Sequence, residues 1–216
     1  MKKLAFFAFV SAFALGGCSY PVQTANVAES GAPSPETAKA AGKWALYVDP
    51  RAYQATFRPD GIVCPIDTYH LDLTTSFREA AAGIFRNIAA EIEPVDHPLP
   101  AQDLASLGYA GEIAITGEDI RHQLSFSQGF FLAAPEAEIT LDARLIATWP
   151  KGTLLQASAS GTGEGSAGGW IGCGRGADAL SQAAEAAMKD LLGKLAERFS
   201  TAPQVRSAAT EGATHI

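Results

Sequence analysis

The chain has little positive charge. Of its 216 residues, 16 are Lys or Arg and 23 are Asp or Glu, and charged residues make up only 18% of the total. Binding of nucleic acid and electrostatic docking on anionic lipid both require a dense basic face. The sequence therefore argues against a nucleic-acid partner. Any contact with a membrane has to come from apolar insertion or from a lipid anchor.

The short motifs of common catalytic and metal centres are also missing. The sequence contains no HExxH, GxSxG, SxxK, GKS/GKT or CxxC pattern. No two histidines stand three or four residues apart; they are His70, His97, His122 and His215. His122 shares the even-numbered phase of Ile120 and Leu124, which favours a partly buried, hydrogen-bonded ring over a metal ligand. We expect no enzyme activity, no metal and no cofactor, although a fold can still assemble a metal site from distant residues.

One glycine-rich segment formally matches a dinucleotide-binding fingerprint. Gly163 to Gly168 reads GxGxxG after an expected strand. The fingerprint also requires that a helix open at these glycines and that a parallel strand follow it. Here at least seven residues separate the motif from the next expected helix. We interpret the segment as a flexible loop that crosses from the last strand to the last helix, with no nucleotide bound.

The apolar run near the start of the chain is too short to span a bilayer. Met1-Lys2-Lys3 is a basic head, and the twelve residues from Leu4 to Leu15 are almost all apolar. This is the layout of a secretory signal, because a membrane-spanning helix needs roughly 20 residues. Once Lys2 and Lys3 are removed with this segment, 14 of the 16 basic residues remain against 23 acidic ones, a formal charge of −9.

The run ends in Leu15-Gly16-Gly17-Cys18, which resembles the lipobox of bacterial lipoproteins. In that family the thiol of Cys18 would receive a diacylglycerol, and the chain would be cleaved on the N-terminal side of this cysteine. Ser19, and not Asp, follows Cys18, which resembles the pattern that sorts lipoproteins to the outer membrane. We expect a protein anchored by lipid in the outer membrane and facing the periplasm. The alternative is an ordinary secretory signal cut near Ala12-Phe13-Ala14, with Cys18 left as a free thiol.

We divide the chain into four parts. Residues 1–17 form the signal peptide. Residues 18–42 form the lipidated N-terminus and a flexible tether, because Pro21, Pro33 and Pro35 break any helix there. Residues 43–199 form a single domain, as expected at this chain length. Residues 200–216 are expected to be a disordered tail.

Within the domain, alternation and helical spacing predict an α+β fold. Strand patterns cover residues 44–48, 53–57, 113–126, 136–145 and 155–159, with a bulge where the apolar phase changes at Gly117. One helix should begin at a cap among residues 74–76 and stop at Pro94, and another should cover residues 177–199. One-sided strands and one-sided helices bury each other's apolar sides. We predict two layers: an antiparallel sheet of four or five strands with two helices packed on one face.

After processing, Cys64 and Cys173 are the cysteines that carry no lipid. Two such cysteines in an exported domain usually pair, because the periplasm is oxidising. The bond would close a loop of about 110 residues, for which the chain-entropy model gives about 4–5 kcal/mol of stabilisation. The alternative is two separate thiols. A metal site is not expected, because the two cysteines are isolated in the sequence.

Three consecutive large apolar residues, Phe130, Phe131 and Leu132, stand between two expected strands. Loops are mostly exposed, and exposed apolar clusters often mark contacts with a partner or a membrane. One interpretation is an apolar finger that meets a partner protein or lipid. The other is that the loop folds back and caps the core.

The order of the elements resembles that of small envelope lipoproteins, including YajG-like proteins and the auxiliary lipoproteins of lipid and lipopolysaccharide transport. The resemblance is one of layout over residues 43–199, and no residue signature accompanies it. It implies a non-catalytic binding or assembly module with a periplasmic or outer-membrane protein as partner. The alternative function is the binding of a lipid or small ligand in an apolar cavity between the sheet and the helices.

Overall fold

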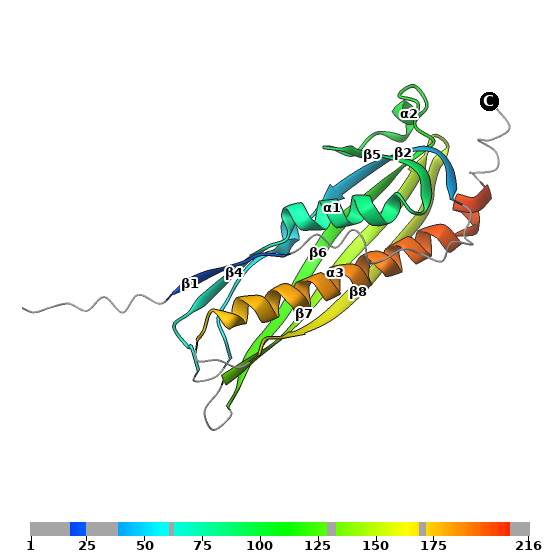
Figure 1. Ribbon diagram of the computed structural model, residues 1–216. Coiled ribbons are helices and arrows are strands. Elements are labelled where there is room, and N and C mark those ends of the chain that lie inside the picture. Colours follow the sequence, from blue (N-terminus) through cyan, green and yellow to red (C-terminus); the bar gives the residue numbers. More distant parts are fainter. Residues whose placement is uncertain (1–17, 25–38, 61–62, 129–132, 169–171, 208–216) are drawn as a thin grey trace, which may run out of the picture.

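Two mixed sheets and two long helices build the molecule (Figure 1). The structure is a computed structural model that describes residues 18–24, 39–60, 63–128, 133–168 and 172–207. The larger sheet has the order β5 (Ala89–Val95), β2 (Ala40–Asp49), β6 (Gly111–Gln128), β7 (Ala133–Trp149) and β8 (Gly152–Ser166). The smaller sheet has the order β1 (Ser19–Val22), β4 (Thr68–Asp72) and β3 (Gln54–Phe57). The helices are η1 (Arg51–Tyr53), α1 (Thr74–Phe85), α2 (Ala101–Leu104) and α3 (Arg175–Thr201).

The predicted α+β class is confirmed, but the prediction of a purely antiparallel sheet is wrong. Strands β6, β7 and β8 are antiparallel, whereas β2 runs parallel to both β5 and β6. In the smaller sheet β1 is parallel to β4, and β3 is antiparallel to it. There are also more strands than the four or five expected. Helices α1 and α3 do cover the same face of the larger sheet (Figure 1).

The end of α1 accounts for the parallel pairing that sequence patterns missed. The first helix was expected to run to Pro94, but it ends at Phe85, and the chain continues as β5 along β2. Ile88 and Ile92 stand at helical spacing from Phe85, yet both are in extended or turning chain. Pro94 is tolerated in β5 because this strand lies at the sheet edge, where a missing N–H breaks no ladder bond.

None of the residues expected as the cap of α1 is its N-cap, which is Leu73; the first turn is instead bonded by the preceding residue, Asp72. The Asp72 carboxylate accepts a hydrogen bond from the Thr74 main-chain N–H at 2.9 Å and another from the Thr74 hydroxyl at 2.6 Å. These bonds, together with one from Gln54, hold the pKa of Asp72 below its usual value. A side-chain acceptor that satisfies an unpaired N–H of the first turn stabilises a helix start.

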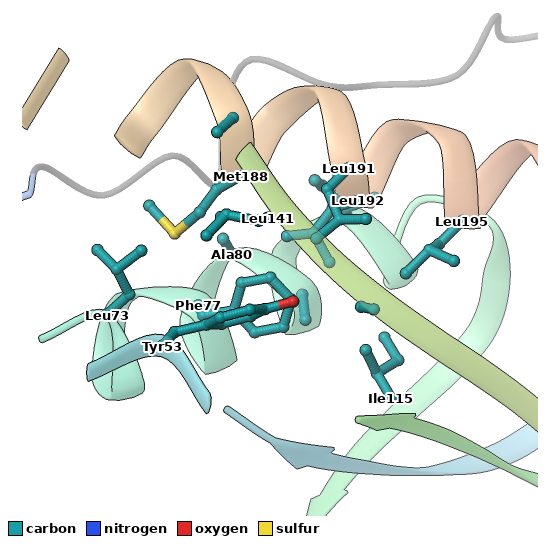
Figure 2. Close-up of a cluster of buried hydrophobic side chains, with 14 of the residues drawn as sticks. Tyr53, Leu73, Phe77, Ala80, Ile115, Leu141, Met188, Leu191, Leu192 and Leu195 are labelled. Atoms are coloured by element: carbon teal, nitrogen blue, oxygen red, sulfur yellow. The ribbon is translucent and has the colours of Figure 1, made fainter. Parts of the chain in front are cut away.

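The core lies between the two long helices and the larger sheet. Figure 2 shows Tyr53, Phe77, Leu141, Met188 and neighbouring side chains gathered there. All four are fully buried. Burial raises the pKa of Tyr53, so its hydroxyl stays protonated and donates to the main-chain oxygen of Asp142 at 2.7 Å.

The predicted alternation of β7 and the predicted bulge in β6 are both confirmed. Ala137, Ile139, Leu141, Ala143 and Leu145 are at most 5% exposed, and the residues between them face the other side. The register of β6 against β7 shifts between Gly117 and Asp119. A Cβ at Gly117 would stand 2.9 Å from the Tyr53 ring, so glycine makes room for this ring at the bulge.

The glycine-rich segment after Ala159 is a strand that packs tightly on α3, and not a flexible loop. Gly161, Gly163 and Gly165 alternate along β8 and face the helix. A Cβ at these glycines would stand 2.0–2.4 Å from main-chain oxygens of Ala179, Ala183 and Ala187, which lie one above the other on α3. Strand and helix therefore touch backbone to backbone, and the GxGxxG match reflects this contact.

Two stretches expected to be disordered extend into the folded body. Of residues 18–42, Ser19–Val22 form β1 and residues 40–42 begin β2, while residues 25–38 lie outside the described part. Of residues 200–216, the first two complete α3 and residues 203–207 form a further helical turn. Val22 and Val205 are 6% and 2% exposed, so burial against distant elements orders both stretches. Residues 1–17 and 208–216 also lie outside the described part.

Candidate functional site

The main chain of Cys18 is held by the folded body, while its thiol is exposed. The N–H of Cys18 donates to Oδ1 of Asp67 at 3.0 Å, and the N–H of Thr68 donates to the Cys18 oxygen at 3.0 Å. Asp67 is only 6% exposed, whereas Cys18 is exposed and is not in a disulfide. The arrangement fixes the backbone of this cysteine and leaves its sulfur accessible to chemistry.

Strand β1 continues this attachment. It pairs in parallel with β4 from Ser19 opposite Thr68 to Val22 opposite Leu71. The Tyr20 ring stacks on the Tyr69 ring with 5.3 Å between centroids. A hydrogen bond with the Cys18 side chain raises the pKa of Tyr20, which places this hydroxyl beside the sulfur.

Buried Tyr69 links β4 to the segment before α3. Its hydroxyl donates to the main-chain oxygen of Cys173, and burial raises its pKa. A Cβ at Gly176 would stand 2.8 Å from the Tyr69 ring, so the first turn of α3 lies directly against this ring. The residues that bind the main chain of Cys18 are therefore connected through β4 to the N-terminal end of α3.

The expected disulfide between Cys64 and Cys173 is present in the structure. Cys64 opens a turn that closes where the Asp67 N–H donates to the Cys64 oxygen at 3.2 Å, and Cys64 itself has a φ of 55°. Pro65 and Ile66 occupy the middle of this turn, and Ile66 is 57% exposed. We call the segment Cys64–Asp67 the tip turn.

The side chains of Cys64, Asp67 and Cys173 come within 4.8 Å of one another, close enough for metal ligands. Both sulfurs are bonded to each other, however, and a thiolate is the form that binds a metal. The Asp67 carboxylate already accepts the Cys18 N–H. We interpret this cluster as a structural junction and not as a metal site.

The face of β6, β7 and β8 opposite the helices is polar, as predicted. Asp142 accepts from Arg121 at 2.7 Å and from the Ser160 hydroxyl, and Arg144 pairs with Glu118 at 2.5 Å. An open hollow of about 610 Å³ lies toward one end of these strands. Its polar lining residues are Gln123, Ser125, Glu136, Glu138, Glu164 and Ser166 of the strands, together with Gln182 of α3, so the hollow extends to the β8 edge of the sheet.

The other candidate residues make no contact with Cys18 that the structure shows, although His70 lies opposite Pro21 in the β1–β4 pair. Phe130, Phe131 and Leu132 lie outside the described residues. His122 stacks on the buried Phe57 ring at 3.9 Å, and burial lowers its pKa. His70 shares a 2.9 Å hydrogen bond with Thr56.

Sequence patterns missed Ile66 and Asp67. An apolar residue next to proline between a cysteine and an aspartate is a weak signal for an exposed turn. The role of Asp67 depends on a partner 49 positions away, which no local pattern reveals. The alternation of Tyr69 and Leu71 with polar neighbours was a usable signal for β4.

Comparisons with known proteins yield distant structural similarities alone. No family model and no curated protein matches the chain. A Xanthomonas campestris protein of the family DUF330 is similar at 12% identity and TM-score 0.48, covering 89% of this chain and 99% of its own. A putative neuraminyllactose-binding hemagglutinin homolog from Helicobacter pylori has 10% identity and TM-score 0.45, covering 83% and 98%. A minor lipoprotein from Acinetobacter baumannii has 9% identity and TM-score 0.36, covering 73% and 91%.

At these identities and TM-scores the similarities assign the chain to no family and transfer no residue role. Among the described residues, no helix has both the length and the apolar character that crossing a membrane requires.

Proposed function

We propose that this protein is a non-catalytic lipoprotein of the cell envelope, acylated on Cys18, that binds or helps to assemble a partner in the periplasm or outer membrane. The observation that carries the proposal is the environment of Cys18. Its sulfur is exposed and its backbone is bonded to Asp67 and Thr68, directly after a lipobox-like segment.

This environment suits a processed lipoprotein cysteine. After cleavage, the nitrogen of Cys18 would be an ammonium group or, if acylated, an amide, and both retain an N–H donor. The buried Asp67 carboxylate is an acceptor for either form. A thioether on the exposed sulfur would displace no core contact and would keep a sulfur acceptor beside the Tyr20 hydroxyl.

The proposed site is the outer membrane, with the domain in the periplasm. Ser19 after the cysteine supports this choice, since its side chain is exposed and Asp is absent there. Each acyl chain contributes roughly 0.8 kcal/mol per buried CH₂, so two or more chains make a durable anchor.

The open polar face of β6, β7 and β8 is our candidate for the partner surface. Both long helices lie on the other face of the sheet (Figure 1). Charged side chains of the three strands, such as Glu138 and Glu164, therefore face solvent. Glu138 pairs across the sheet with Glu164, and this like-charged pair would be relieved by a basic partner group.

The alternative of a ligand cavity between sheet and helices is disfavoured where β8 meets α3. There the glycine backbones leave no room even for a methyl group. The hollow lined by Glu136, Glu138 and Glu164 is open and polar, which does not suit a lipid.

Mass spectrometry of the mature N-terminal peptide tests the anchor. We expect a peptide that begins at Cys18 and carries the mass of acyl chains. The Cys18→Ser protein should leave the membrane fraction, while the Cys64→Ala/Cys173→Ala protein, which keeps Cys18, should stay. An unmodified N-terminus, or a Cys18→Ser protein that still fractionates with membranes, would overturn the proposal.

Photo-crosslinking in cells tests the partner surface. A photoreactive residue at Gln123, on the open face, should give a discrete crosslinked species. The same residue at the exposed Lys189 of α3 should not. An identical species from both positions, or one from Lys189 alone, would exclude the open face as the specific surface.

A further inference from the structure

We infer that the tip turn enters the surface of the phospholipid bilayer through Ile66, so that the domain stands on the membrane in a fixed orientation. This inference rests on the proposed function, because the lipid on Cys18 is what brings this end of the molecule to the bilayer. It goes beyond that function, since an anchor alone would allow the domain to swing freely.

The tip turn is clamped at both ends. Cys64 is bonded to Cys173, and the Asp67 carboxylate accepts the N–H of Cys18. The hydrogen bond from the Asp67 N–H to the Cys64 oxygen closes the turn itself. Pro65 restricts the backbone further, since its φ is fixed by the ring. Ile66 is therefore presented on a rigid support one residue away from the residue that holds Cys18.

Ile66 is unusual among the described residues for its exposure. In the part of the chain that the structure describes, Ile66 and Leu107 are the two large apolar side chains that are exposed, at 57% and 53%. Ile66 is not part of the core, and the turn holds its side chain in an exposed position. Exposed apolar side chains next to a lipid anchor bind the acyl boundary of a bilayer by hydrophobic burial.

Leu107 is an exposed apolar residue that should not reach the bilayer, in contrast to Ile66. It follows α2, which lies at the opposite end of the molecule from β1 and the start of β4 (Figure 1). Between these ends runs α3, whose 27 residues span about 40 Å. If the tip turn touches lipid, the α2 end is held well away from the bilayer.

Apolar burial, and not charge, fits this surface. The chain is acidic overall, and Arg175 near this end already pairs with Asp178 at 3.0 Å. Net-zwitterionic lipid is therefore the appropriate occupant, because contact with an anionic surface would depend on free basic groups.

Depth-dependent fluorescence quenching tests the inference. The acylated full-length protein is purified in detergent and reconstituted into phosphatidylcholine vesicles with bromine in the upper acyl chains. Ile66→Trp and Leu107→Trp are compared in a Trp149→Phe/Trp170→Phe background, and the background protein supplies the baseline. Bromine quenching should be roughly twofold or more greater for Ile66→Trp than for Leu107→Trp, because only the former residue reaches the acyl region.

The controls distinguish failure of the proposed function from failure of this inference. Mass spectrometry of the same preparation reports whether Cys18 is acylated, and an unacylated protein would defeat the proposed function before quenching is considered. If Cys18 is acylated and the vesicles hold the protein, equal quenching at the two positions would overturn the membrane contact of Ile66. Thermal unfolding of each variant shows whether it is folded; both positions are exposed, so either change should leave the core intact.

Discussion

The main-chain N–H of Cys18 meets the buried carboxylate of Asp67 at 3.0 Å, across 49 positions of sequence. The residue proposed to carry lipid is thus part of the folded body and not the free end of a tether. Any force or rotation applied at Cys18 would be transmitted to β4 and, through the turn before β4, to the disulfide. Acylation of Cys18, as proposed, would therefore couple attachment to the membrane with the orientation of the domain.

Replacing Asp67 by Ala should weaken the attachment of Cys18 and β1 to β4. The N–H of Cys18 loses its acceptor, and a hydrogen bond to a charged, buried partner contributes about 1.5–3 kcal/mol. In hydrogen exchange, the Thr68 amide, which donates to the Cys18 oxygen, should exchange faster than in the parent protein. Asp67→Asn keeps an acceptor oxygen and should retain most of the protection. Unchanged protection of Thr68 in Asp67→Ala would show that the carboxylate does not hold β1.

Replacing Gly163 by Ala should strongly destabilise the domain. The added Cβ would stand 2.2 Å from the Ala183 main-chain oxygen, so α3 or β8 has to shift. Overpacking of this kind costs about 1–3 kcal/mol or more, measured as a lower denaturant midpoint. Gly168→Ala is the matched control, because nothing lies within 4 Å of its added Cβ. Equal stability of the two variants would contradict the backbone contact of β8 with α3.

Removing the disulfide should lower stability without releasing the anchor. The bond joins residues separated by 109 positions, so the Cys64→Ala/Cys173→Ala protein should lose about 4–5 kcal/mol by the chain-entropy model. Thiol titration of the denatured, unreduced mature protein checks the premise: the Cys64 and Cys173 thiols should not react. Two reactive thiols, or an unchanged unfolding midpoint in the double variant, would show that the bond does not contribute.

Local patterns predicted the parts of the fold that rest on local information. The alternation of β7 and the bulge at Gly117 could be read directly, because each follows from side chains that are neighbours in sequence. The pairing of Cys64 with Cys173 followed from redox chemistry and the small number of cysteines.

The parts that were missed depend on distant partners. Strand β1 has four residues and is ordered by β4, while Ile88 and Ile92 fit a helix as well as they fit the turn and strand that follow α1. The sequence predicted only part of the candidate site. It identified Cys18 and the disulfide, whereas Asp67 and Ile66 acquire their roles only through contacts formed in the folded chain. Gly161, Gly163 and Gly165 alternate like a strand, but an apparent nucleotide motif obscured that period.

Glu112 predicts a pH dependence of stability that does not involve the anchor. This carboxyl is 4% exposed, and burial raises its pKa above the ordinary value of 4.5, although the Leu99 N–H donates to it at 2.7 Å. A raised pKa means that the native state binds the proton more tightly than the unfolded chain does. The stabilisation from this group is complete below pH 4.5 and is lost as pH rises through the native pKa.

The variant Glu112→Gln carries no such charge and retains an oxygen for the Leu99 N–H. Its stability relative to the parent protein should therefore increase as pH rises from about 4 to 7, as measured by urea unfolding at a series of pH values. The exposed Glu91 on β5 supplies the control, since Glu91→Gln should show a much weaker trend. A difference between Glu112→Gln and the parent that stays constant across this range, or that shrinks, would mean that the Glu112 carboxylate is ionised without penalty in the folded protein.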